Sequence, residues 1–212
     1  MIKYACSKTR FNKNIKKHKM TILKDDGLYR HLHFADPQDS HYWFDIVTYP
    51  HNLIISGDRN TFHFSRIEDM FKFFIMDDRD FNKKNVINPH YWSEKIKGGK
   101  DHIEVYSEDA VKAYVKERFK NYTEDHGIRG EEKKELWEKI QENILDYPDD
   151  QHNVYKNLYH FDGNNMFEDT DFNFNEFSLS YIWCCYAIVW GITKYNKLKG
   201  KSNEQEKKNK SN

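Results

Sequence analysis

The sequence predicts an α+β fold in which a small antiparallel meander of about four strands packs against four or five helices in a single domain. In the first third of the chain, short segments rich in aromatic and β-branched residues alternate with turn residues. Connections this short require antiparallel neighbours. The second half carries apolar residues at the spacing of amphipathic helices. Together these three observations indicate a sheet covered by helices.

The predicted strands are short and alternate in polarity. In the first of them, Leu32 and Phe34 lie on one face, while His31 and His33 lie on the other. The strands are expected at 28–34, 42–49, 53–56 and 61–65, with turns at 50–52 and 57–60.

Helices are predicted around and after the meander. Ser65 and Glu68 form a capping-box pattern just ahead of an apolar run, which predicts that a helix begins at 66. Ser107 is expected to cap a later amphipathic helix, and Pro148 to stop the next one. The expected helices cover 66–75, 107–126, 130–146 and 176–198, with an irregular segment at 77–106 that contains one helical turn at 91–96.

Composition changes along the chain define the expected domain organisation. Residues 1–24 are basic and weakly patterned, which indicates a solvated N-terminal arm. A single α+β domain is expected at 25–198, and it includes an acidic segment at 146–176. Residues 199–212 are rich in lysine and lack apolar side chains, which indicates a disordered basic tail.

The overall charge and the cysteine content set limits on the class of protein. The formal net charge is +0, so the whole molecule has no global field that attracts nucleic acid or membrane. Three cysteines, two of them adjacent, indicate reduced thiols rather than a disulfide framework. The longest apolar run is about 12 residues, short of the roughly 20 that a membrane helix needs. We therefore expect an intracellular protein without a membrane segment.

Eleven histidines raise the question of a metal site. His31 and His33 point to the same side of one strand, and His41 or His63 could add a third ligand, with Asp45 as a carboxylate. Such a set would suit zinc or iron. None of these residues has a diagnostic ligand spacing, so the interpretation that we favour has no metal and no cofactor.

A metal-dependent phosphodiesterase or nuclease is the enzymatic alternative. Carboxylates that hold a divalent metal, together with a lysine, are typical of nuclease sites. The residues of this alternative are Asp45, Asp58, His31, His33 and Lys95. The short Glu-x-Lys strand element of such sites is missing, so catalysis is not our leading expectation.

Aspartate is depleted in strands, which makes Asp45 unusual among its aromatic neighbours. The interpretation that we favour is a structural ion pair with Arg30 or Arg66.

Two segments are candidate binding surfaces. Tyr91 and Trp92 could stack on bases or anchor a protein partner if exposed, and would pin their segment to the sheet if buried; burial is the expected outcome. The acidic segment 146–176 has eight Asp or Glu against one Lys and is interleaved with Tyr and Phe, so it could imitate a nucleic-acid surface or be an ordinary solvated loop. The candidate binding residues are Arg66, Asn88, Tyr91, Trp92 and Lys95.

Four sequence blocks resemble an uncharacterised family of phage and prophage proteins. They read YWFDIVTYP, ISGDRNTFHFSRIEDMFKFF, INPHYWSEK and IWCCYAIVWGITKY. The resemblance implies a phage accessory protein in the host cytoplasm and implies no enzyme. The polar positions in these blocks are Asp45, Asp58, Arg66, Asp69, Asn88 and Lys95.

The leading functional hypothesis is therefore a binding protein that occupies a host or phage protein, for example a host defence or nucleic-acid-processing protein in counter-defence. The alternatives are the metal-dependent nuclease and a direct nucleic-acid binder that uses the basic ends and the Tyr91–Trp92 segment.

Overall fold

The computed structural model describes residues 5–75, 87–161, 166–167 and 172–209. The chain divides into two compact units. Unit 1 comprises Met1–Glu104 and Phe177–Asn212, and unit 2 comprises Val105–Glu176. The α+β class is confirmed, since helices accompany a six-stranded sheet and a two-stranded sheet.

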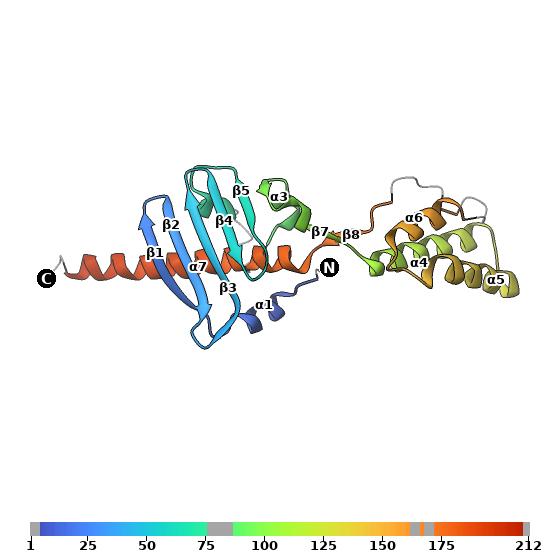
Figure 1. Ribbon diagram of the computed structural model, residues 1–212, viewed down its shortest axis with the longest axis horizontal. Coiled ribbons are helices and arrows are strands. Elements are labelled where there is room, and N and C mark those ends of the chain that lie inside the picture. Colours follow the sequence, from blue (N-terminus) through green and yellow to red (C-terminus); the bar gives the residue numbers. More distant parts are fainter. Residues whose placement is uncertain (1–4, 76–86, 162–165, 168–171, 210–212) are drawn as a thin grey trace. The chain divides into compact units, whose positions relative to one another are not determined.

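Unit 1 is built on an antiparallel meander whose spatial order follows the chain order (Figure 1). The predicted meander is thus confirmed, but it has six strands rather than about four. Its strands are β1 (Lys19–Asp26), β2 (Tyr29–Asp36), β3 (Asp39–Tyr49), β4 (Asn52–Gly57), β5 (Phe62–Ser65) and β6 (Ile96–Gly98).

The first of the two additional strands, β1, begins within residues 1–24, which were expected to be a solvated arm because of their basic composition. Helix α1 (Lys8–Asn14) begins where the Ser7 hydroxyl accepts a hydrogen bond from the Arg10 amide. Phe11 and Ile15, four residues apart and therefore on one helical face, are both buried in the core. Lys13 lies between them and Lys16 and Lys17 follow, all three exposed. These lysines mask the apolar stripe in the sequence, which is why the expectation of a solvated segment was wrong for residues 8–24.

The second additional strand, β6, lies within the segment expected to be irregular. It pairs with β5, and the Ser65 amide donates to the Lys95 carbonyl just before β6 begins. This pairing holds Ser65 in the sheet, so Ser65 does not cap a helix. Helix α2 (Met70–Ile75) starts later, where the Asp69 carboxylate accepts from the Phe71 amide. Residues 76–86 of the expected irregular segment lie outside the described residues.

One face of the sheet packs on α7 (Leu179–Asn209), which runs along it (Figure 1). The strand side chains on that face are fully buried: Leu32, Phe34, Phe44, Ile46, Leu53, Ile55, Phe62 and Phe64. The middle of α7 is buried on most sides, as its apolar composition predicted. The helix continues to Asn209, so most of the segment expected to be a disordered tail extends α7 instead.

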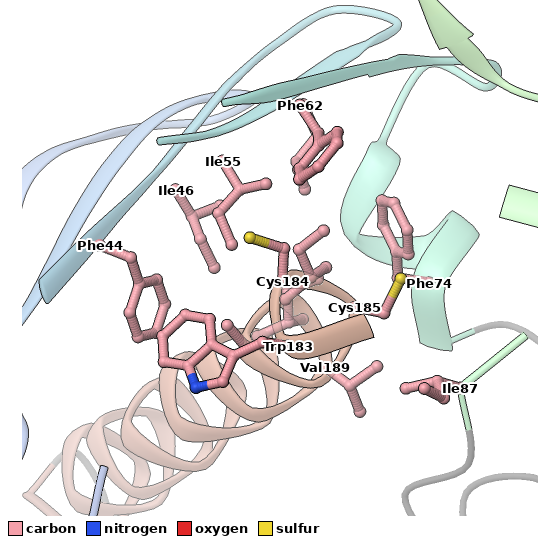
Figure 2. Packing of buried hydrophobic residues seen from close by; sticks show 14 of the residues in the cluster. Phe44, Ile46, Ile55, Phe62, Phe74, Ile87, Trp183, Cys184, Cys185 and Val189 are labelled. Atoms are coloured by element: carbon pink, nitrogen blue, oxygen red, sulfur yellow. The ribbon is translucent and has the colours of Figure 1, made fainter. Parts of the chain in front are cut away.

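Close approach of α7 to the sheet requires Gly191. A Cβ atom at this position would lie 2.7 Å from Ile46 Cδ1 and 3.0 Å from Phe34 Cζ. Figure 2 shows the packing nearer the start of the helix, where Cys184 points toward Ile55 and Cys185 toward Phe74. The two adjacent thiols thus fill different parts of the core, and both are free and buried, as is Cys6.

Short helices complete unit 1 between β5 and α7. Trp92 in α3 (Pro89–Ser93) packs on Phe74 of α2 with ring centroids 4.8 Å apart. A 3₁₀ turn, η2 (Lys100–His102), then leads toward unit 2.

Unit 2 is helical and has its own hydrophobic core. Its helices are α4 (Glu108–Asp125), α5 (Gly130–Ile140), the π-helical turn η3 (Gln141–Leu145) and α6 (Gln151–Tyr159). Ser107 caps α4 as predicted, since its hydroxyl accepts from the Ala110 amide at 3.1 Å. The core residues are Val111, Val115, Ile140, Ile144, Val154, Leu158, Met166, Phe167 and Phe174. The strands β7 (Glu104–Tyr106) and β8 (Asn175–Phe177) pair where the chain passes between the units.

None of the described helices combines the length and the apolar composition that a bilayer crossing requires.

Candidate functional site

The sheet face opposite α7 carries His31, His33, Asp45 and His63, four of the polar side chains predicted as candidates. We call it the open face. Alternation along the strands places these residues there, because the residues between them are buried under α7. On strands β2 to β5 the open face includes Tyr29, His31, His33, Trp43, Asp45, Val47, Tyr49, Asn52, Ile54, Ser56, His63 and Ser65. All of them are at least partly accessible to solvent.

A carboxylate shared by two histidines lies at the centre of the open face. His33 is directly opposite Asp45 in the β2–β3 register, and its Nδ1 lies 2.7 Å from Asp45 Oδ1. His31 Nε2 lies 3.4 Å from the other carboxylate oxygen, Oδ2. Neighbouring His63 Nε2 is 2.7 Å from the side-chain oxygen of Asn52. His31, His33 and Asp45 therefore lie together on the open face.

The expected ion pair of Asp45 with an arginine was wrong. Arg30 shares the core face of β2 with Leu32, so it cannot reach Asp45 on the open face. Its guanidinium instead pairs with Asp69 at 2.8 Å and lies over the Phe71 ring. Arg66 is exposed beyond the end of β5. Face alternation alone excludes the Arg30–Asp45 pair.

The remaining residues of the enzymatic alternative do not join this cluster. Asp58 accepts a hydrogen bond from the Tyr42 amide, which holds the turn after β4 against the start of β3. Lys95 Nζ lies 2.9 Å from Glu94 and 4.6 Å from the centroid of the Tyr91 ring. Across the part of the chain that the structure describes, no three His, Cys, Asp or Glu side chains are arranged to hold a metal ion.

The Tyr91–Trp92 segment is a short helix, and only part of it is available to a ligand. Asn88 caps this helix by accepting from the Tyr91 amide. Trp92 is buried, as expected, and belongs to the core. Tyr91 is 39% exposed, so its expected burial was wrong, and it contacts Phe73 and Lys95. Of the candidate binding residues, Arg66 and Tyr91 are therefore exposed, and Asn88 and Lys95 are partly exposed.

Aromatic residues on the open face are the features that sequence analysis missed. Trp43 is 36% exposed, Tyr49 37% and Tyr29 51%. The alternation of Trp43 and Tyr49 with buried residues was visible in the sequence, yet both faces of β3 are rich in aromatics. Only the position of α7 shows which face is open.

The neutral total charge hides a division between the two units. Unit 1 contains 25 Lys or Arg against 16 Asp or Glu, a net charge of +9. Unit 2 contains nine Lys or Arg against 18 Asp or Glu, a net charge of −9. Residues 146–176 carry eight Asp or Glu against one Lys, whereas residues 105–145 carry ten against eight Lys or Arg. Most of the negative charge of unit 2 therefore lies in the segment that the sequence singled out.

Unit 2 also has a groove of about 400 Å³ along α5. Its floor is apolar and half-buried, formed by Tyr122, Ile128 and Leu136. Exposed charged residues surround the floor: Glu132, Glu135, Glu138, Glu142 and Lys139. We call this feature the acidic groove.

Buried thiols offer no reactive site. Burial raises the pKa of Cys184 and that of Cys185 far above the ordinary thiol value. At neutral pH both therefore stay protonated and act as small apolar side chains.

Comparison of the chain with known protein families, with curated proteins and with solved structures finds no match.

Proposed function

We propose that this protein is a binding protein that acts by occupying a basic surface of another protein, and that unit 2 carries the docking surface. The observation that supports this most strongly is the concentration of negative charge in one compact unit, with a net charge of −9. Such a charge raises the association rate with a basic partner and disfavours acidic ones.

The acidic groove gathers four glutamates against one lysine at a single site of unit 2. Its floor of Tyr122, Ile128 and Leu136 can bury apolar side chains of a partner, while the four glutamates around the floor pair with lysine or arginine. Proteins that bind or process nucleic acid have surfaces rich in lysine and arginine, which are complementary to this groove. The resemblance to phage proteins favours a host protein of that class as the target, in the host cytoplasm.

A retention experiment with matched variants tests the proposal. The tagged full chain is incubated with nuclease-treated lysate of the host that the resemblance implies. The groove variant changes Glu132, Glu135, Glu138 and Glu142 to Gln. The control variant changes four exposed acidic residues on α4, Asp109, Glu117, Glu124 and Asp125, to their amides.

We expect one basic protein to be retained by the wild type and by the control variant, and to be lost with the groove variant. Equal retention by all three proteins, or recovery of nucleic acid alone from untreated lysate, would contradict the proposal. In that second case the direct nucleic-acid alternative would take its place.

A further inference from the structure

We propose that the open face of unit 1 binds single-stranded nucleic acid, with Trp43 and Tyr49 as stacking residues. This inference does not depend on the acidic groove, because it concerns the other unit and the opposite charge. It also replaces the surface that the sequence suggested for nucleic acid, since Trp92 is buried.

Aromatic rings are exposed on the flat surface of the open face. Trp43 and Tyr49 lie on the same face of β3, six residues apart, which corresponds to about 20 Å along the strand. Arg30 pairs with Thr48 in the antiparallel β2–β3 register, so the preceding residue Tyr29 lies opposite the following residue Tyr49. Exposed aromatic side chains stack on unpaired bases of any sequence.

Lysines lie beside these rings on the edge strand β1. Lys19 pairs with Ala35 and Lys24 with His31 in the β1–β2 register, so both lysines lie on the open face. Both are exposed, and Lys24 Nζ lies 5.8 Å from the centroid of the Tyr29 ring. The exposed carboxylate of Asp26 lies on the same side, opposite Tyr29. Lys19 and Lys24 thus give one rim of the face positive side chains.

A carboxylate lies at the centre of the open face. Asp45 would repel a phosphate backbone if it stood alone. His31 and His33 both contact it, so its charge is directed into the cluster rather than toward a ligand.

Single strands fit this surface better than duplexes. Unpaired bases present π-faces, whereas a duplex presents only base edges and phosphates to a protein surface. The ligand class is therefore single-stranded DNA or RNA bound with little sequence preference.

The test is fluorescence anisotropy of the full chain with a labelled 20-nucleotide oligo-dT, a 20-nucleotide oligo-U, a 20-base-pair duplex and a heparin fragment. We expect the wild type to bind both single strands more tightly than the duplex. Trp43→Ala should weaken oligo-dT binding about 5- to 100-fold, and Trp43→Phe should restore part of the loss. The aromatic control is Tyr147→Ala, an exposed tyrosine of unit 2.

The salt dependence of the affinity measures the electrostatic contribution to binding. The double variant Lys19→Glu/Lys24→Glu should reduce the slope of log affinity against log salt concentration by about 1.4, because two phosphate contacts are lost. The control variant Lys72→Glu/Lys197→Glu changes two exposed lysines that lie on helices α2 and α7.

Three results would overturn the proposal: no binding to either single strand, tighter binding to heparin or duplex than to oligo-dT, or equal losses in the Trp43 and Tyr147 variants. Binding of a protein by the open face, without any binding of oligonucleotides, would also overturn the proposal.

Discussion

His33 Nδ1 lies 2.7 Å from Asp45 Oδ1, directly across the β2–β3 register and on the face that α7 leaves open. This contact explains why an aspartate is tolerated in the middle of an aromatic strand. Since the same carboxylate also faces His31, it stabilises two half-exposed imidazoles at once.

Replacing Asp45 tests this structural role. Asp45→Ala removes the hydrogen-bond partner of His33 and the carboxylate that faces His31 at 3.4 Å. We expect the free energy of unfolding to fall by about 1 kcal/mol, because both contacts are partly exposed. Urea denaturation at pH 7 measures the change. Asp26→Ala, at an exposed position of β1, is the control, and its free energy of unfolding should differ from that of the wild type by less than about 0.5 kcal/mol. Equal effects of the two substitutions would show that the cluster contributes nothing to stability.

Packing of Gly191 against Ile46 can be tested with a double-mutant cycle. Gly191→Ala places a Cβ 2.7 Å from Ile46 Cδ1 and should cost about 1–3 kcal/mol, less any gain in helix propensity. Ile46→Val removes the clashing methyl group and alone costs about 1 kcal/mol. We expect the double variant to lose less stability than the sum of the single variants. Strict additivity would mean that α7 does not approach the sheet at this point.

Asp25 links β1 to α7 and makes stability depend on pH. Burial alone would raise the pKa of Asp25, but hydrogen bonds with Lys199 and Tyr195 outweigh burial and lower the pKa below its ordinary value. A carboxylate whose pKa is lowered by folding stabilises the protein at every pH above its unfolded-state pKa. This contribution is lost as the pH falls through the folded-state pKa.

Asp25→Asn should therefore lower the Tm at pH 7, and the difference from the wild type should shrink as the pH falls from about 4 toward 2. Thermal scans across this range provide the measurement, with Asp26→Asn as the exposed neighbouring control. A difference that stays constant over the whole range would exclude the proposed linkage.

Alkylation tests the burial of the thiols. Burial raises the pKa of Cys6, Cys184 and Cys185, so iodoacetamide should leave the native protein unmodified at neutral pH. In urea all three cysteines should react, and mass spectrometry counts the adducts. Rapid modification of Cys184 in the native state would contradict the packing of α7 on the sheet.

Local patterns were enough to predict part of this fold. Alternation at 28–34 and 42–49 predicted the strands and the residues that share each face, including Asp45 with Trp43. Capping by Ser107 was predicted because a cap is a contact within three residues. The Ser65 capping box failed because a distant strand, β6, pairs with Ser65 and holds it in the sheet.

Long-range features were not accessible from the sequence. Which face of β3 is open depends on α7, more than 130 residues away, because both faces of β3 carry aromatic side chains. The acidic segment 146–176 was recognised, yet the unit that contains it starts at Val105, and only the separate core of Val111, Ile140 and Leu158 defines that boundary.

Site-specific photo-crosslinking tests most directly whether unit 2 docks on a basic protein through the acidic groove. A photoreactive residue replaces Glu135 in the groove or, as a control, Glu117 on α4 outside it. We predict that position 135 crosslinks a single basic protein in nuclease-treated host lysate and that position 117 does not. Crosslinks of equal yield at both positions, or none at position 135, would contradict the claim.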